Sequence, residues 1–323
     1  MNTEKENALP GDAKSSKWQQ DLIERLALQA SVEQRRTRRW GVFFKSLLFV
    51  YLFTLLYLYF PGDLDTGSAK RHTALVELKG VIAPDEDANA DNVVAGLRAA
   101  FEDDNSVAVI LSINSPGGSP VQAGYINTEI RRLREKYPDK PLYAVVADIC
   151  ASGGYYVAAA ADEIYADKAS IVGSIGVRMD GFGFVEAMKK LGIERRLLTA
   201  GEHKDFLDPF QPARESDIRH VQSLLDDIHQ QFIDTVREGR GERLKETPEL
   251  FSGLVWTGEQ ALELGLVDGL GNAGYVAREV IGEETIVDYT PEEDIWQRVS
   301  KRFGTALGEG IGKVLVNGAY RLY

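Results

Sequence analysis

The feature that most constrains the fold is an alternation of apolar runs with helical segments that begins at Arg71. Strand-like runs cover 72–82, 107–114 and 141–149, and helical segments cover 91–103 and 119–138. Runs that are apolar throughout, with helices between them, are typical of parallel strands covered on both faces. The sequence therefore predicts an α/β fold. Folds of this kind bind ligands at the carboxyl ends of the strands.

The rest of the chain continues this pattern with shorter elements. We expect helices over 152–164, 184–192 and 214–237, a capped short helix within 256–271, and a strand within 284–289. The long helix carries an apolar stripe at spacings of three and four, which predicts a buried face. Its members are Ile218, Val221, Leu225, Ile228, Phe232 and Val236.

Two consecutive strand ends share a glycine-bearing turn that leads into a helix. One reads "SPGGSP" and contains Gly117 and Gly118; the other reads "CASGGYY" and contains Ser152. Glycine permits positive φ and close backbone approach, and unpaired N–H groups at a helix start suit a developing negative charge. Each turn, taken alone, is explained as an ordinary strand-to-helix connection that needs glycine only for its backbone geometry. Together, with a serine at the helix start, they indicate that Ser152 is a nucleophile.

A serine hydroxyl needs a neighbouring base, and the residues alone leave that base open. The four histidines are His72, His203, His220 and His229, and none forms an evident Ser-His-Asp order. Lys204 lies in an irregular loop, and an unprotonated lysine can act as a base. A lone loop lysine is more often simply solvated. The single cysteine, Cys150, excludes an intramolecular disulfide and is expected to be a small buried apolar residue.

An apolar segment over 40–60 precedes the alternating region and contains one charge, Lys45. About 20 apolar residues match the length of a membrane-spanning helix. Arginines cluster directly before the segment, which predicts a cytoplasmic N-terminus. A cleaved signal peptide and a buried core helix are the alternatives. The segment is long for the first, and apolar on every face, which disfavours the second.

These boundaries predict five parts. They are a cytoplasmic N-terminal arm (1–39), a transmembrane helix (40–60), a linker (61–71), an α/β domain that contains Ser152 (72–271) and a C-terminal helical extension (272–323). The net charge of −12 disfavours nucleic acid as a partner, because no basic excess is available to meet phosphates.

Four motifs in order resemble the signal peptide peptidase A family of serine peptidases, in its short form. They are "NSPGG" (114–118), "ASGGYYVA" (151–158), "VGSIGV" (172–177) and "GEHKDF" (201–206). The resemblance covers about residues 74–271 and implies that the domain over 72–271 is a peptidase domain. It implies Ser152 as nucleophile, Lys204 as general base and Ser174 as the hydroxyl that orients the lysine amine. It also implies an oxyanion hole formed by the N–H groups of Gly118 and Gly153.

The resemblance further implies a crotonase- and Clp-like stacked βαβ spiral and assembly as a homo-oligomeric ring. The expected substrates are cleaved signal peptides, with the catalytic domain outside the cytoplasm on the inner membrane. No cofactor or metal is expected. Two other hypotheses stay open on the same fold: an enzyme acting on acyl-CoA, and a non-catalytic scaffold.

Overall fold

The computed structural model describes residues 36, 38–55 and 70–291. The chain divides into two compact units, Met1–Ser68 and Ala69–Tyr323. In the first unit, residues 36 and 38–55 are helical and their side chains are exposed. Within the described ranges, no helix combines the length and apolar character that a membrane crossing requires. The predicted span over 40–60 is described only as far as residue 55. The rest of that span, nearly all of the N-terminal arm, most of the linker and 292–323 lie outside the described residues.

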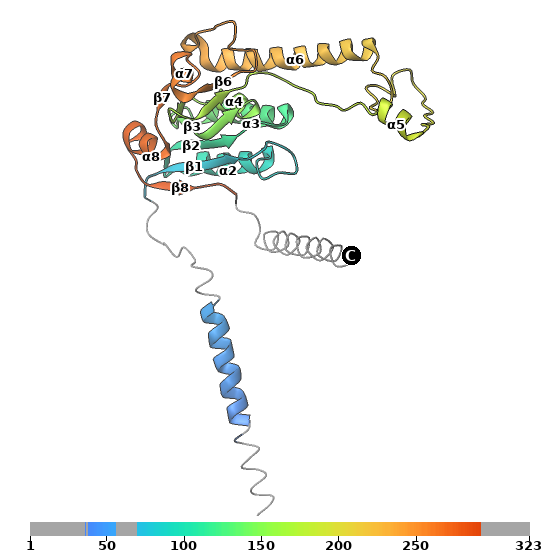
Figure 1. Cartoon of the computed structure of the whole chain (residues 1–323). Coiled ribbons are helices and arrows are strands. Elements are labelled where there is room, and N and C mark those ends of the chain that lie inside the picture. The colour runs from blue at the N-terminus through green and yellow to red at the C-terminus, as the bar shows by residue number, and fades with distance from the viewer. Residues whose placement is uncertain (1–35, 37, 56–69, 292–323) are drawn as a thin grey trace, which may run out of the picture. The chain divides into compact units, whose positions relative to one another are not determined.

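The second unit is built on an eight-stranded sheet of the described residues (Figure 1). Its order is β6-β5-β3-β2-β1-β8, with β4 pairing both β3 and β7. All pairs are parallel except β5 with β6. The strands are β1 His72–Lys79, β2 Ser106–Ser115, β3 Leu142–Ala151, β4 Glu163–Ala166, β5 Ile171–Gly173, β6 Val255–Thr257, β7 Gly269–Leu270 and β8 Ile286–Asp288. The α/β fold predicted from the sequence is confirmed.

Helices bury the two faces of the sheet unequally. One face packs its strand side chains against α2, α3 and α4 in one large core, and the other packs a smaller cluster against α8 and η2. The helical elements are α2 Ala90–Glu102, α3 Pro120–Lys136, α4 Gly153–Ala158, α5 Val185–Leu191, α6 Glu215–Arg240, η1 Gly241–Arg243, α7 Gly258–Glu263, α8 Ala273–Tyr275 and η2 Val276–Ile281. The larger core, formed with α2, α3 and α4, therefore supports the ends of the strands.

Two expected helices differ from the structure. The predicted helix over 152–164 stops at Ala158, because the chain turns and enters β4, which pairs with β3 and β7. The long helix is present as α6, but its expected stripe is buried only at Phe232 and Val236. Ile218 at the other end is 52% exposed. The first half of α6 extends past the sheet (Figure 1), so the sheet does not cover that part of the stripe, and Val221, Leu225 and Ile228 are only partly buried.

An irregularity in β3 shapes the sheet edge where ligands are expected. Ile113 of β2 pairs with Val146, but Ser115, two residues later, pairs with Cys150, four residues later. The start of β3 pairs with β4, and its end pairs with β5. Two extra residues in β3 thus shift its end from one neighbour to the next. This shift carries the residue after β3 to the corner between β2 and β5.

Candidate active site

Ser152 stands at this corner in a backbone conformation that is rare for a residue with a side chain. Its φ is 53° and its ψ is −124°. Its N–H donates to the carbonyl of Gly173 at 2.8 Å, and its own carbonyl accepts from Tyr156 at 3.0 Å. Such strain is tolerated only where surrounding contacts impose it, and it concentrates at functional sites. The half-buried Ser152 is thereby placed between the end of β3 and the first turn of α4.

The loop after β2 lies directly against this serine. A Cβ at Gly117, whose φ is 96°, would come within 2.7 Å of the Ser152 Cβ. A Cβ at Gly118 would come within 2.1 Å of the carbonyl oxygen of Ile82. Both positions therefore require glycine for space. The approach of two backbones is the reason for the small residues in the first motif.

Hydrogen bonds to the segment after β1 hold this loop. Ile82 donates to the Gly117 carbonyl at 2.9 Å, and Ser119 donates to the Ile82 carbonyl at 2.7 Å. The buried Ser115 hydroxyl donates to the Gly80 carbonyl at 2.6 Å and accepts from the Gly117 N–H at 3.1 Å. Ser115 was not singled out from the sequence. A small polar residue ending an otherwise apolar strand is the signal that could have found it.

The predicted oxyanion-hole glycines lie next to each other. A Cβ at Gly153 would stand 3.2 Å from the amide nitrogen of Gly118. The loop and ladder bonds described at this corner use the N–H groups of Ile82, Ser119 and Ser152. The N–H groups of Gly118 and Gly153 take no part in them, and Gly153 is the first residue of α4, where an N–H has no helical acceptor. Two neighbouring amides beside a serine form the arrangement that stabilises a carbonyl oxyanion.

Ser174 is brought to the same corner by β5. Ala151 pairs with Gly173, so Ser152 and Ser174 each follow a paired residue on adjacent parallel strands. The φ of Ser174 is 52°, and its N–H donates to the Leu254 carbonyl at 2.7 Å. Among the described non-glycine residues, only Ser152, Ser174 and Leu207 have positive φ.

Lys204 is not part of this corner within the described chain. It is exposed and lies in turns after Gly201, between α5 and α6. We call residues 176–214 the α5 segment. α5 has no buried residue and lies beside the distal end of α6, away from the sheet (Figure 1). In the described residues, the side chains of Ser152, Ser174 and Lys204 form no hydrogen bond to one another. The structure brings together four of the five predicted residues, Ser152, Ser174, Gly118 and Gly153.

Comparison with known proteins identifies the chain. The model of peptidase family S49 matches residues 134–285. A protein of Methanocaldococcus jannaschii named "Putative protease" is 33% identical over 240 residues, which is 72% of this chain and 76% of that protein. The chain belongs to peptidase family S49.

Other relatives agree over similar stretches. An Enterococcus faecium protein named "Putative signal peptide peptidase SppA" is 29% identical over 235 residues, covering 70% of this chain and 68% of that protein. A Brucella abortus protein named "Na(+)/H(+) antiporter NhaA" is 50% identical over 188 residues, covering 58% of this chain. This chain spans only 25% of that longer protein. The antiporter name therefore says nothing about the matched quarter.

The S49 assignment gives the corner its chemical context. The family match includes Ser152, Ser174 and Lys204, and it is a family of serine peptidases. A strained serine beside two free amides is able to attack a carbonyl and hold the resulting oxyanion. Burial raises the pKa of the Cys150 thiol, which is fully buried under the corner, so that the thiol is not the nucleophile of this S49 site.

Proposed function

We propose that the protein is a membrane-anchored serine endopeptidase with a Ser152–Lys204 dyad that degrades cleaved signal peptides and other extracytoplasmic peptides. One observation carries the proposal: the φ of 53° at Ser152 aims a serine into a corner lined by the amides of Gly118 and Gly153. The successive βαβ units and the divided pairing of β3 support a crotonase- and Clp-like spiral as the finer description of the fold.

The proposed chemistry begins with attack of the Ser152 Oγ on the substrate carbonyl carbon. The neutral Lys204 amine accepts the hydroxyl proton, and Ser174 orients that amine. The carbonyl oxygen becomes an oxyanion that accepts hydrogen bonds from Gly118 and Gly153. Collapse of this intermediate breaks the peptide C–N bond, and the departing amine takes the proton from the lysine. Water then attacks the acyl-serine ester and loses its proton to Lys204. Collapse of this second intermediate breaks the bond between the acyl carbon and the Ser152 Oγ, the serine oxygen takes the proton back from Lys204, and the acid is released.

The lysine is proposed to come from a neighbouring protomer of a homo-oligomeric ring. Two observations support this. Lys204 lies in the α5 segment, whose helix α5 buries none of its side chains, and the α5 segment exposes many apolar residues. They are Met179, Phe182, Phe184, Leu191, Ile193, Leu197, Leu198 and Phe210. Monomeric soluble proteins seldom expose apolar patches of this kind unless they mark an interaction site. A second copy would cover them while bringing its serine to the lysine.

The membrane anchor is proposed from the apolar residues of the segment over 40–60, and the substrate class from the apolar residues near Ser152. The segment over 40–60 is placed in the inner membrane as a single pass, with the N-terminus cytoplasmic and the catalytic unit outside. Its described part is helical with exposed apolar side chains. Near the corner, the side chains of Val81, Val121 and Tyr125 are 50%, 56% and 61% exposed. These exposed side chains adjoin the loop that carries Gly118, at Val81 and at the start of α3, and they favour apolar peptides, such as the core of a signal peptide.

The nucleophile is tested by labelling the detergent-solubilised full chain with a fluorophosphonate. We expect one modified residue, Ser152, located by mass spectrometry of the digested protein. Ser152→Ala should abolish labelling, and Ser252→Ala, which removes an exposed hydroxyl outside the site, should not. Labelling that persists in Ser152→Ala would refute the assignment.

The shared dyad is tested by co-expressing Ser152→Ala with Lys204→Ala under different affinity tags. If a site combines two protomers, mixed assemblies contain sites with both intact groups and peptide cleavage returns. If the dyad lies within one chain, the mixture stays inactive. Sequential purification on both tags confirms that the two variants are in one assembly.

A further inference from the structure

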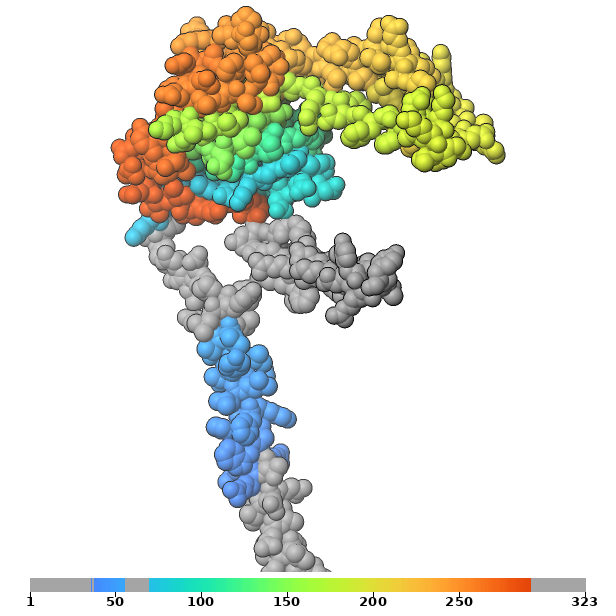
Figure 2. Space-filling model, in the orientation of Figure 1, coloured from blue at the N-terminus to red at the C-terminus, as the bar shows by residue number. Residues whose placement is uncertain are grey.

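The α5 segment is joined to β5 at one end and to α6 at the other, and most of the buried residues of α6 lie toward its C-terminal end. Phe232, Val236 and Arg240 are its buried residues in that half, whereas Ile218 and Leu224 near its start are 52% and 45% exposed. The space-filling view shows the first half of α6 and the α5 segment projecting from the packed core (Figure 2). The direction of α6 therefore contributes to the position of Lys204.

The held end of α6 packs on α4, the helix that begins next to Ser152. Gly239 approaches so closely that a Cβ there would stand 1.9 Å from the carbonyl oxygen of Ala159. About two turns earlier, the rings of Phe232 and Tyr156 are 5.3 Å apart between centroids. These contacts fix how near α6 lies to α4. Apolar contacts alone leave sliding and rotation weakly defined, because they lack directional bonds.

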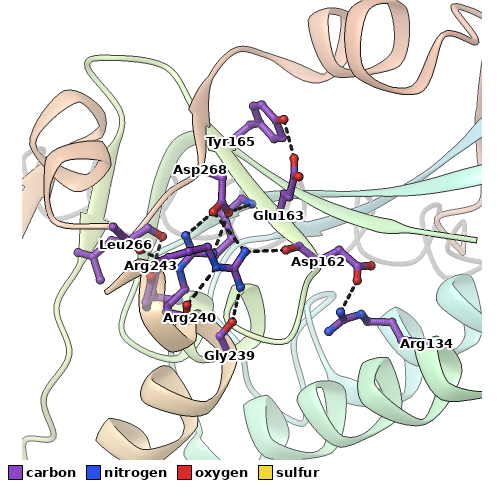
Figure 3. Close-up of polar contacts among 12 residues, drawn as sticks. Arg134, Asp162, Glu163, Tyr165, Gly239, Arg240, Arg243, Leu266 and Asp268 are labelled. Carbon is purple, nitrogen blue, oxygen red and sulfur yellow. Dashed lines mark hydrogen bonds and ion pairs between the residues drawn. The ribbon is translucent and has the colours of Figure 1, made fainter. Parts of the chain in front are cut away.

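A buried ion pair at the end of α6 provides directional bonds that restrict this sliding and rotation (Figure 3). The side chain of Arg240 is 1% exposed, and both terminal nitrogens donate to the two oxygens of Asp268 at 2.8 Å. Its Nε donates to the Gly265 carbonyl at 2.9 Å. Asp268 also accepts from the Ile164 N–H at 2.7 Å, which ties the pair to β4. Burial opposes ionisation of Asp268, but the hydrogen bonds and charge of Arg240 hold its pKa below the ordinary value.

The loop between α7 and β7, which contains Gly265 and Asp268, also contacts α4, the helix that follows Ser152. The hydroxyl of Tyr155, a fully buried residue of α4, donates to the Leu266 carbonyl at 2.7 Å. Arg243 adds hydrogen bonds to the carbonyls of Asp162 and Gly239. One cluster of bonds thus links the end of α6 to α4 and to β4. A buried ion pair contributes little net stability compared with well-packed apolar residues, so its presence here points to geometric specificity.

We propose that Arg240 is a positioning residue, whose two-pronged bond to Asp268 sets the direction of α6 and so the place at which Lys204 is presented to the serine of a neighbour. The inference rests on the shared site proposed above. The 26 residues of α6 give it a length of about 39 Å. A tilt of about 5° at the held end moves the far end by roughly 3 Å at that length. Misplacement of a catalytic group by 1 Å costs up to about 100-fold in rate.

The test uses Arg240→Lys, which keeps the charge but removes the planar fork. In a mixed assembly, Ser152→Ala chains donate the lysine and Lys204→Ala chains donate the serine. We expect Arg240→Lys in the lysine-donating chain to lower the restored kcat by about tenfold or more, with KM unchanged. The same substitution in the serine-donating chain should change kcat by less than about twofold, because the α5 segment of that chain contributes no base.

The matched control is Arg237→Lys, one turn earlier on the same helix. Arg237 also forms a two-pronged pair, with Glu246 at 2.7 and 2.8 Å, but both partners are exposed. It should be neutral in either chain. Melting temperature of each variant checks folding, and Asp268→Asn replaces Arg240→Lys if that variant does not accumulate.

The possible outcomes separate the two proposals. Equal loss of kcat in both placements indicates a general structural role and overturns the positioning proposal, as does the absence of any loss. If the unmodified mixture of Ser152→Ala and Lys204→Ala regains no activity, the shared site is refuted, and the role of Arg240 toward a neighbour falls with it.

Discussion

The corner at Ser152 and the α5 segment differ in how their conformations are determined. At the corner, three paired strands and two glycine turns hold each backbone atom through contacts inside one chain. In the α5 segment, α5 buries no residue and Leu198 is 96% exposed. The difference shows that contacts within one chain determine the backbone around Ser152, Gly118 and Gly153. In the described residues, they do not bring Lys204 beside that corner.

This contrast indicates that packing within the chain and assembly between chains have different roles. A serine with strained backbone angles needs rigid surroundings, which the large hydrophobic core provides. A lysine that serves another protomer needs reach, which α6 supplies. Exposure of its apolar residues has a cost in solubility unless a second copy covers them. The following predictions test the contrast, beginning with the largest effect.

Ser152→Ala should remove peptidase activity while leaving the corner folded. Loss of a covalent nucleophile is expected to lower kcat by about 10⁴-fold or more, because the acyl-enzyme route disappears. The rate is measured with a fluorogenic apolar peptide on the detergent-solubilised full chain. Its melting temperature should stay within about 2 °C of the parent. An alanine variant that retains substantial turnover would contradict the nucleophile assignment.

Lys204→Ala should lower activity by about 10²–10⁴-fold, the usual contribution of a general base. The rate of the parent should rise with pH on the acid-to-alkaline side, because only the unprotonated amine accepts a proton. That rising limb should vanish in Lys204→Ala. The control is Lys190→Ala, an exposed lysine of α5, which should keep both rate and pH profile. A low-pH optimum would indicate a carboxylate mechanism instead.

Two leucine substitutions test packing in the two regions directly. Leu111→Ala, in β2 and fully buried, should lower the free energy of unfolding by about 2–5 kcal/mol. Leu198→Ala, in the α5 segment, should change it by less than about 0.5 kcal/mol. In sedimentation velocity, the second variant should nevertheless dissociate at higher protein concentration than the parent. Unchanged association would show that this part of the α5 segment is not the covered surface.

The sequence predicted the corner better than the segment, for a physical reason. Apolar runs and paired glycines report contacts within one chain, so β1 to β3 and the turns at Gly118 and Ser152 could be inferred. The early end of α4 could not, because β4 forms through its pairing with β3 and with distant β7. The stripe of α6 was read as buried in its own chain. Periodicity identifies an apolar face but not which molecule covers it.

The support that holds the corner could be inferred even less. Ser115 and Arg240 act through partners far away in sequence, Gly80 and Asp268, and no local pattern marks such pairs. No sequence pattern set His229 apart from the other histidines, yet its Nε2 lies 3.2 Å from the carbonyl oxygen of Ile175, the residue directly after Ser174. A helix position that is partly buried and partly exposed has no distinctive pattern in the sequence. Tertiary contacts decide it.

The smallest expected effect concerns one acidic residue in each region. Glu129 of α3 accepts hydrogen bonds from Arg132 at 2.6 and 2.9 Å and from Arg98 of α2 at 2.6 Å. The hydrogen bonds of Arg132, then those of Arg98, lower the pKa of Glu129 to about 2 from its ordinary 4.5. A depressed pKa means that the ionised form stabilises the folded state. That contribution is complete above pH 4.5 and is lost as the pH falls toward 2.

Glu129→Gln should therefore lower the free energy of unfolding near neutral pH and matter progressively less in acid. Both arginines are about half exposed, at 53% and 49%, so solvent screening limits the effect to about 1 kcal/mol. The matched change in the α5 segment is Glu194→Gln, which breaks an exposed pair with Arg196. It should have no measurable effect at any pH. Urea unfolding at pH 7, 5 and 3 provides the comparison. A Glu129→Gln difference that is the same at pH 7 and 3 would show that the pair contributes by packing rather than by charge.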